Sequence, residues 1–551
     1  MSETLVHDLL VSSAERFPTR TAVVDAERAL TYAELDSAAN RVANLLSAQG
    51  VGRGDTVALY LEKSLEAVVG IYGILKVGGT YVPLDPAAPI PRLGAIANDA
   101  DTRVLITDKE RADHWAALIA EGAPVETLVV LNAADGEVAA PPGVRILTSS
   151  SAGEQTSDAL THVRCSNSDL AYILYTSGST GVPKGVMLSH LNAMAFVDWA
   201  ANEFAVIEID RLSSHAPFHF DLSVFDLFAA AKAGAAVVLV PSQLALFPVE
   251  LTRWIRNSAI SVWYSVPSIL TLLVLRGKLA EVELPSLRTI LFAGEVFPTK
   301  HLHRLVDLLP RVRFANLFGP TETNVCTWYD VPRWTSEPPT SIPIGKAING
   351  VEVFAVRDDG TISPPGEVGE LYVRGPTVMQ GYRKDEARTA ATLIRNWQGE
   401  GHGYPVYRTG DLARLDENGD WNFLGRRDSQ IKSRGYRIEL GDIEAALHLH
   451  PSVVECAVVV IPDDVVTNRI KAFVVARGAV DEDELSRFCT SRLPRYMAPE
   501  LYEFRVELPR SSTGKIDRRA LSKEALNQAQ AVSDPNSGRP RMAHMPSENE
   551  R

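Results

Sequence analysis

The sequence is poor in cysteine and has no excess of basic residues. Its 551 residues include four cysteines, which lie far apart and form no C-x-x-C pair. A disulfide framework or a zinc site is therefore not expected, and a reducing cytoplasm fits this usage. The formal net charge is −13 at pH 7, so the basic footprint of nucleic-acid-binding proteins is missing. We expect no nucleic-acid partner.

Long hydrophobic runs are missing as well. Residues 1–8 show no basic stretch followed by an apolar core, and no apolar run approaches the ~18 residues that a membrane helix needs. We therefore expect a cytoplasmic protein that does not engage a membrane. Apolar residues make up 46% and charged residues 22% of the chain, as is usual for soluble globular proteins. At roughly 100–200 residues per domain, the length allows at least two domains.

Strand and helix patterns alternate along most of the chain. Strand-like apolar runs, such as 57–61, 104–107, 127–131 and 288–293, are separated by segments with helical spacing. This alternation predicts an α/β fold in which mainly parallel sheets are covered by helices. The polar, serine-rich stretch at 149–158 predicts a surface loop.

The pattern changes in the last third of the chain. From about residue 342, alternating runs are joined by Asp-Gly and Asn-Gly, which are hairpin signals. We predict a large N-terminal core at 1–427 that includes an antiparallel β subdomain over about 342–427. A small α+β domain, the lid, is predicted at 428–525. Residues 526–551 are rich in Gln, Ser, Pro, Asn and Glu and predict a disordered tail.

One short segment combines the features of a phosphate-binding loop. Residues 175–185 read YTSGSTGVPKG and directly follow the apolar run Leu170–Leu174. Small residues let the backbone approach a ligand, amides and hydroxyls can donate to a polyanion, and Lys184 adds positive charge. A Walker A loop needs Gly-Lys followed by Ser or Thr, whereas Lys184 stands between Pro183 and Gly185. A glycine-rich surface turn would have the same composition, so other segments have to decide.

The segment LYTSGSTGVPKGV resembles the signature of the adenylate-forming superfamily, which contains acyl-CoA synthetases, luciferases and the adenylation domains of nonribosomal peptide synthetases. Four further segments resemble motifs of that superfamily: NLFGPTET at 316–323, YRTGD at 407–411, GRRDSQIKSRGYRIE at 425–439 and PRSSTGKID at 509–517. The resemblance implies an adenylation core and a mobile lid that turns about Asp428.

The resemblance also implies roles at the nucleotide. Phe318 would stack on adenine, with Asn316 near its exocyclic amine. Thr321 would reach the α-phosphate, and Glu322 would hold Mg²⁺ through a carboxylate oxygen, as this hard cation prefers. Asp411 would bind both ribose hydroxyls. The residues implied to bind ATP or AMP are Thr176, Ser177, Gly178, Ser179, Thr180, Lys184, Gly294, Glu295, Asn316, Phe318, Gly319, Thr321, Asp411, Arg426 and Lys432.

The implied reaction has two halves. A substrate carboxylate attacks the α-phosphate of ATP in line, pyrophosphate leaves, and preplaced positive groups supply most of the help. Lys515 would enter the site as the catalytic residue of this step. The lid would then turn, withdraw Lys515 and admit a thiol, so that one fold serves both halves.

The segment HFDLSVFDLF at 219–228 resembles the Phe-Asp-x-Ser motif of members that activate amino acids. There the aspartate, here Asp221, pairs with the α-amino group of the substrate. A buried carboxylate is costly without a cation, which favours a cationic substrate, although an aspartate that caps a helix would look the same. The pocket implied by resemblance comprises Lys515 and Asp221, Leu222, Phe225, Tyr264, Leu291, Ala293, Leu317, Val325 and Cys326.

Apart from Lys515, this pocket has one anion, no cation and mostly apolar walls. Cys326 is interpreted as a small apolar wall rather than a nucleophile. The set suits a compact apolar amino acid and resembles that of free-standing prolyl adenylating enzymes, although Phe225 departs from the leucine of many of them. One methylene changes binding in such a pocket by about 1–3 kcal/mol, so pipecolate or a dehydroproline stays open beside L-proline.

The acceptor thiol is expected on another molecule. Few residues follow Lys515, and none of them form a Gly-x-Ser attachment motif for phosphopantetheine. The acceptor would be a phosphopantetheinylated carrier protein in trans or coenzyme A. An acyl- or aryl-CoA ligase stays an alternative that Asp221 disfavours. A catalytically silent nucleotide-binding module is a further alternative, which intact Lys515, Glu322 and Asp411 disfavour.

Overall fold

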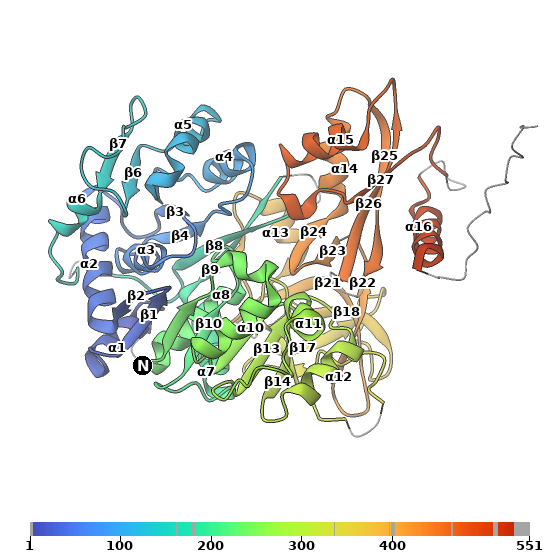
Figure 1. The fold of residues 1–551 in the computed structure, drawn as a ribbon, viewed down its shortest axis with the longest axis horizontal. Coiled ribbons are helices and arrows are strands. Elements are labelled where there is room, and N and C mark those ends of the chain that lie inside the picture. The colour runs from blue at the N-terminus through green and yellow to red at the C-terminus, as the bar shows by residue number, and fades with distance from the viewer. Residues whose placement is uncertain are drawn as a thin grey trace, which may run out of the picture.

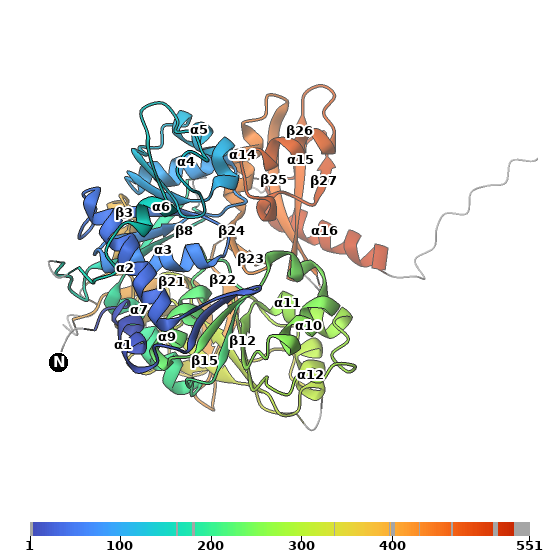
Figure 2. The same ribbon diagram turned by 60° about the vertical axis from the view of Figure 1, so that its left-hand side comes forward.

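The structure, a computed structural model, describes residues 4–533 except 161–162, 179–181, 335–336, 396, 398–402, 429, 464–466 and 511–515. Ser179, Thr180 and Lys515, which the sequence assigns to the active site, lie outside the described residues. The described chain forms two large sheets with helices on their faces, an antiparallel subdomain and a smaller C-terminal unit (Figure 1, Figure 2).

An eight-stranded sheet carries the predicted phosphate loop. In spatial order its strands are β19 (Gly381–Tyr382), β9 (Lys184–Ser189), β8 (Leu170–Thr176), β4 (Thr80–Pro83), β3 (Thr56–Tyr60), β5 (Val104–Thr107), β6 (Thr127–Val130) and β7 (Arg145–Thr148). Neighbours from β8 to β7 run parallel, and β9 pairs antiparallel with β8 and β19. The strands predicted at 57–61, 104–107 and 127–131 are confirmed.

A nine-stranded sheet packs against it through a shared apolar layer. Its strands are β16 (Lys346–Ala347), β15 (Thr327–Asp330), β14 (Arg313–Phe318), β13 (Thr289–Ala293), β12 (Val262–Ser265), β10 (Arg211–Ser214), β11 (Ala236–Leu239), β1 (Thr21–Asp25) and β2 (Arg28–Thr31). Val237 and Leu239 enter one buried cluster, and Val238 and Val240 enter another. Both faces of the sheet are covered here, which explains why Val237, Val238, Leu239 and Val240 form a continuous apolar run.

Helices separate and cover the two sheets. Pro248–Asn257 (α10), Pro267–Arg276 (α11) and Thr299–Leu308 (α12) pack on the outer face of the nine-stranded sheet. Tyr32–Ala48 (α2), Leu65–Lys76 (α3) and His190–Glu203 (α7) contribute to the central layer. Ile90–Asp99 (α4) and Ala112–Ala120 (α5) cover the other face of the eight-stranded sheet. The remaining core helices are α1 (Asp8–Arg16), α6 (Ser149–Gly153), α8 (Leu222–Val224) and α9 (Ala230–Ala233).

Helix α6 corrects the prediction of a surface loop throughout 149–158. The Ser151 N–H donates to Thr148 Oγ1 at 3.5 Å, and the Thr148 N–H donates to Ser151 Oγ at 3.3 Å. Such a reciprocal cap starts a helix, and Ala152 is the residue through which this helix is buried. The prediction failed because serine stands where a glutamate or glutamine usually marks this cap.

The predicted antiparallel subdomain follows the two large sheets in the chain. Its strands are β17 (Glu352–Val356), β18 (Val368–Arg374), β21 (Val406–Leu415), β20 (Leu393–Ile394) and β22 (Trp421–Arg426), with helix α13 (Glu386–Thr392) between them. Two short strands of the same stretch join the large sheets instead, since β16 pairs with β15 and β19 pairs with β9. The subdomain is therefore tied into both sheets.

In its described residues the lid consists of a hairpin, a three-stranded sheet and three α-helices. Its elements are β23 (Gln430–Ser433), β24 (Tyr436–Glu439), α14 (Leu440–His448), β25 (Val453–Asp463), β26 (Thr467–Ala476), α15 (Glu482–Thr490), β27 (Leu501–Phe504) and α16 (Arg518–Ser533). The hairpin β23–β24 lies between the three-stranded sheet of the lid and the core (Figure 1, Figure 2).

Helix α16 corrects the start of the predicted tail at residue 526, because the helix continues to Ser533. Leu521, Ala525 and Ala529 recur every fourth residue and pack into one apolar cluster with β25 and β26. This spacing places them on one helix face, and packing carries the helix through a stretch whose composition is polar.

Candidate active site

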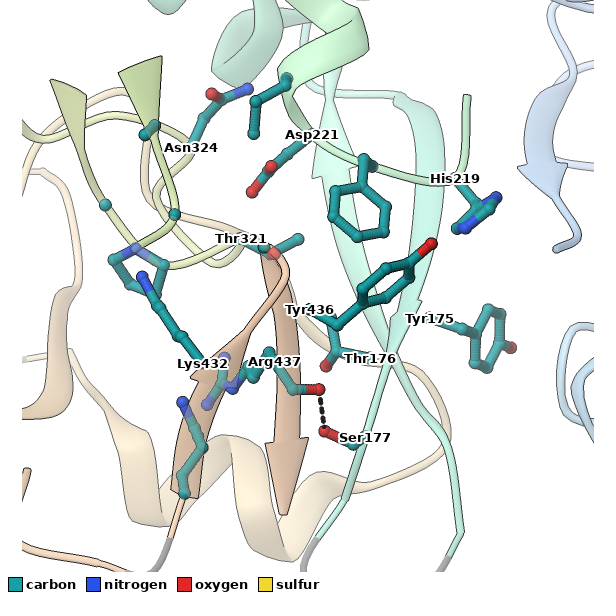
Figure 3. A pocket seen from close by; sticks show the side chains of 18 of the residues that line it. Tyr175, Thr176, Ser177, His219, Asp221, Thr321, Asn324, Lys432, Tyr436 and Arg437 are labelled. Atoms are coloured by element: carbon teal, nitrogen blue, oxygen red, sulfur yellow. Dashed lines mark hydrogen bonds between the residues drawn. The ribbon is translucent and has the colours of Figure 1, made fainter. Parts of the chain in front are cut away.

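The predicted site residues converge where strands of both large sheets end. β8 ends at Thr176, β13 at Ala293 and β14 at Phe318, and ligands commonly bind outside the carboxyl ends of such strands. A cavity lies there (Figure 3). A second cavity shares Asp411 and Lys432 with the first.

The two cavities divide most of the predicted residues between them. The first is lined by Thr176, Ser177, Asp221, Leu222, Tyr264, Ala293, Gly294, Gly319, Thr321, Val325, Asp411, Arg426 and Lys432. The second is lined by Gly294, Glu295, Asn316, Leu317, Phe318, Asp411, Arg426, Asp428 and Lys432.

The predicted phosphate loop joins β8 to β9, and Thr176 pairs with Lys184 across the hairpin. A Cβ on Gly178 would lie 2.4 Å from the Val182 carbonyl oxygen, so glycine is needed for this close approach. The Thr176 hydroxyl is buried and has no hydrogen-bond partner among the described residues. Burial, with a contribution from the Arg437 guanidinium, lowers the pKa of Lys184 to about 8.

Glu322 is fully buried and surrounded by hydrogen-bond donors. Its Oε1 accepts from the Tyr382 hydroxyl at 2.7 Å and from Lys184 Nζ at 3.2 Å. Arg437 Nη1 donates to both carboxylate oxygens, at 2.8 and 2.7 Å. Burial favours the neutral form, but Arg437 and Lys184 outweigh it and hold the pKa of Glu322 well below its usual range. The carboxylate is therefore ionised.

The second cavity contains the residues predicted at adenine. Asn316 Nδ2 donates to the Pro343 carbonyl at 2.9 Å. The other amide atom, Asn316 Oδ1, can accept a hydrogen bond from a ligand. Lys432 Nζ, from the lid, lies 5.4 Å from the centroid of the Phe318 ring. This aromatic face and this amide acceptor are the groups that a purine base with an exocyclic amine needs.

Asp411 and Asp428 share one arginine. Arg426 Nη1 donates to Asp411 Oδ1 at 2.6 Å, and its Nε and Nη2 donate to the two Asp428 oxygens at 2.8 and 2.7 Å. Burial raises the pKa of Asp411, although Arg426 opposes the rise. The residue predicted to pivot the lid is thus linked through Arg426 to the residue predicted to hold the ribose.

Asp221 lies at the start of α8 and points toward the centre of the first cavity (Figure 3). It occupies the N-cap position, yet its side chain makes no capping hydrogen bond, so the capping interpretation of this aspartate fails. Burial raises the pKa of the Asp221 carboxyl. Leu222, Tyr264 and Ala293 line the same cavity and give it apolar walls beside the acid.

Three residues predicted in the substrate pocket lie behind its wall. Phe225, Leu291 and Cys326 are completely buried and belong to the central apolar cluster. The Phe225 ring meets the Tyr264 ring edge to face, with centroids 5.6 Å apart. Burial raises the pKa of Cys326 to about 12, so the thiol stays protonated and packs as a small apolar group.

The lid hairpin is docked against the cavity. The Gly435 N–H donates to Glu295 Oε1 at 2.8 Å, and Ser177 Oγ donates to the Arg437 carbonyl at 2.7 Å (Figure 3). Two residues predicted at the nucleotide therefore hold the lid in this arrangement. Burial raises the pKa of Glu295, with the backbone hydrogen bonds opposing it.

The structure adds residues that the sequence reasoning missed. Arg437 and Tyr436 lie within the matched segment 425–439, so their motif contained the signal. Tyr382 comes from the two-residue strand β19, and no local pattern marks it. Further residues lining the first cavity are Arg92, Tyr175, His219, Phe220, Pro320, Asn324, Gln430, Gly435 and Tyr496.

Two family models match the chain in order. The model for AMP-binding enzyme covers residues 10–383, and the model for AMP-binding enzyme C-terminal domain covers residues 442–515. The chain therefore belongs to the AMP-binding, adenylate-forming enzymes, a family that uses ATP.

The chain is also similar to individual proteins of known name and to a solved structure. The chain is 42% identical over 522 residues to an L-proline--[L-prolyl-carrier protein] ligase of Pseudomonas fluorescens, covering 94% of this chain and 99% of that protein. It is 38% identical over 501 residues to a ligase of the same name from Streptomyces coelicolor, with 90% and 92% covered. The crystal structure of the Vibrio cholerae adenylation domain AlmE in complex with glycyl-adenosine-5'-phosphate has the same fold, with a TM-score of 0.81, 24% identity and coverage of 94% and 97%.

Two features are absent from the part of the chain that the structure describes. No helix there combines the length and apolar character needed to cross a membrane. In the same residues, His, Cys, Asp and Glu side chains form no group of three or more that could hold a metal ion.

Proposed function

We propose that the protein is an AMP-forming ligase that activates L-proline with ATP and transfers it to the phosphopantetheine thiol of a separate carrier protein. Residues 1–427 would be the adenylation core, and the lid would turn about Asp428. The proposal is supported by 42% identity over nearly the full length of a prolyl-carrier protein ligase.

The observation that carries the substrate assignment is the placement of Asp221. Its carboxyl faces a cavity whose adjacent walls are Leu222, Tyr264, Ala293 and Val325, and it makes no cap to its own helix. An ionised carboxylate among apolar walls is stabilised by a cation. The ammonium of a compact apolar amino acid supplies that cation, whereas a benzoate or fatty acid brings none.

The nucleotide would extend from the second cavity to the phosphate loop. Phe318 and Asn316 offer the base a ring face and an acceptor, and Asp411 offers the ribose a carboxylate. Thr176 and Lys184 offer phosphate a buried hydroxyl and an ammonium. With its ammonium at Asp221, the amino acid would place its own carboxylate toward Thr321, which lines the same cavity.

The chemistry of Glu322 fits Mg²⁺, which in nucleotide sites takes one or two carboxylates together with phosphate oxygens. Both carboxylate oxygens accept from Arg437 in this arrangement, so the fit requires that Arg437 withdraw. Glu322 would hold the ion, which when bound supplies positive charge at the phosphates.

Exchange of pyrophosphate into ATP tests the proposal. Proline should support the fastest exchange, ring-size analogues such as pipecolate and azetidine-2-carboxylate slower exchange, and benzoate or a fatty acid none. Incubation with a phosphopantetheinylated carrier protein should then yield a prolyl thioester that coenzyme A does not replace. Exchange with benzoate but with no amino acid would instead identify an aryl-CoA ligase.

A further inference from the structure

Glu322, the proposed metal ligand, is held by an arginine that belongs to the other domain. Arg437 lies on β24 of the lid, whereas Glu322 follows β14 of the core. Arg437 Nη1 contacts both carboxylate oxygens at 2.8 and 2.7 Å, and the Glu322 side chain is 0% exposed. Charge-assisted bonds of this kind are short and strong, and this one spans the boundary between core and lid.

The hairpin β23–β24 also contacts a second residue of the proposed phosphate site, Ser177. The Arg437 carbonyl accepts from Ser177 Oγ at 2.7 Å, and Ser177 belongs to the predicted phosphate loop. A triphosphate that used the Ser177 hydroxyl would have to displace this carbonyl. Docking of the hairpin and binding of a metal–triphosphate therefore draw on the same two core residues.

We propose that Arg437 is a positioning residue for thioester formation, which docks the lid by taking the Glu322 carboxylate that Mg²⁺ uses during adenylation. The inference rests on the proposed function for the identity of the two half-reactions. Arg437 and the metal are alternatives at one carboxylate, because two cations on the same two oxygens repel each other. The lid can settle on the core only after the metal pyrophosphate has left.

The surroundings of Glu322 explain why Arg437 and Mg²⁺ would replace each other at its carboxylate. Withdrawal of Arg437 alone would leave a fully buried carboxylate with Lys184 and Tyr382, and an incompletely paired buried charge is costly. Mg²⁺ at Glu322 would remove that cost. By linkage, Mg–nucleotide binding would weaken docking of Arg437 by the same factor by which that docking weakens Mg–nucleotide binding.

This linkage gives a test that does not depend on proline or on a carrier protein. Affinity for Mg–ATP is measured by equilibrium dialysis for the wild type and for Arg437→Gln. Loss of the competing guanidinium should tighten Mg–ATP binding at least about fivefold, whereas affinity for ATP in EDTA changes less. Arg434→Gln is the matched control, because Arg434 is exposed and pairs with Glu500 within the lid.

Lid position is read separately by energy transfer. Dyes are placed on Gln243→Cys in the core and Asp483→Cys in the lid, both exposed residues, in a Cys165→Ser background. Without ligand, the docked fraction should fall in Arg437→Gln and be partly restored in Arg437→Lys, which keeps the charge. In the wild type, Mg–ATP should undock the lid at lower nucleotide concentration than ATP in EDTA.

The outcomes separate this inference from the proposed function. Tighter Mg–ATP binding together with a lower docked fraction supports the exchange at Glu322, even if proline proves to be the wrong substrate. Unchanged or weaker Mg–ATP binding in Arg437→Gln, with Arg437→Lys giving the same result, overturns it. Thioester transfer from supplied prolyl-AMP should be slowed more than pyrophosphate exchange, and an equal effect on both halves also counts against it.

Discussion

Three acidic residues of the site differ in what surrounds them, and this difference sets their charge. Glu322 has a guanidinium and an ammonium beside it, and its pKa is lowered. Asp411 has Arg426, yet burial still raises its pKa. In the described part of the chain no cation forms an ion pair with Asp221, and burial raises its pKa as well. The acid that faces the substrate cavity is thus the one without an ion pair among the described residues, and Thr321 and the more distant Lys432 only partly offset its burial.

The raised pKa of Asp221 predicts how proline binding depends on pH. Below this pKa the carboxyl is neutral in the empty pocket and must lose a proton when the substrate ammonium binds. Binding is therefore fully developed above the raised pKa and weakens as the pH falls through it. The KM for proline in pyrophosphate exchange should therefore rise as the pH falls, and the rise should begin above the ordinary aspartate pKa of about 3.9.

Asp221→Asn should remove this pH dependence and weaken proline binding by about 3 kcal/mol, roughly 100-fold, since an ammonium would be left without its anion. Asp198→Asn, on the half-exposed pair with Lys232, is the control for loss of one negative charge. An unchanged KM profile in Asp221→Asn would show that another group receives the ammonium.

At the scale of elements, the hairpin β23–β24 is shaped by one glycine. Gly435 has φ +80°, and a Cβ there would lie 2.3 Å from Val266 Cγ1. The left-handed backbone alone would cost another residue about 1 kcal/mol. The collision acts only when the hairpin is docked, because Val266 belongs to the core.

Gly435→Ala is therefore expected to slow thioester transfer about tenfold more than it slows adenylation. Both rates are measured on one preparation, by pyrophosphate exchange and by transfer from supplied prolyl-AMP. Gly419→Ala is the matched control, because Gly419 has φ +76° and no atom within 4 Å of an added Cβ. If both variants behave alike, backbone strain rather than docking is responsible.

Elements with a local pattern could be predicted from the sequence, and elements fixed by distant contacts could not. Strands β3, β5 and β6 lie where the sequence predicted them. A strand that is buried on both faces needs apolar residues at consecutive positions, and such a run is visible in the sequence. The two-residue strand β19 has no such pattern, since it exists only by pairing with β9.

The site shows the same division. Asp221, Asp411 and Lys432, which were predicted from the matched motifs, line one cavity. The bond from Arg437 to Glu322 joins residues 115 positions apart and depends on how the lid rests on the core, which no local spacing encodes. Phe225 and Cys326 were predicted in the substrate pocket, but both are completely buried and neither lines the first cavity.

At the scale of the whole molecule, our proposal gives the lid different groups for the two half-reactions. The described lid presents Gly435 and Arg437 to the core. Lys515 lies outside the described residues, and its role rests on the PRSSTGKID segment. The two faces of the lid would serve in turn.

Lys515→Ala should lower adenylate formation at least about 100-fold, because a positive group at the developing phosphate charge is lost. Thioester formation from supplied prolyl-AMP should be spared, since the lid would have withdrawn Lys515 by then. Burst and single-turnover measurements of both halves check this, with Lys523→Ala in α16 as the control. Equal loss in both halves would reject the role.

Strand β19 also determines where the chain can be divided. It sits on the edge of the eight-stranded sheet through Tyr382 and Val186, although it follows β17 and β18 in the chain. A fragment ending at 383, the limit of the AMP-binding match, keeps β19 but loses β20, β21 and β22, leaving β18 with a bare edge that invites aggregation. A soluble truncation should therefore extend through Arg426, and chimeras that exchange only the C-terminal unit have their safest junction just after that arginine.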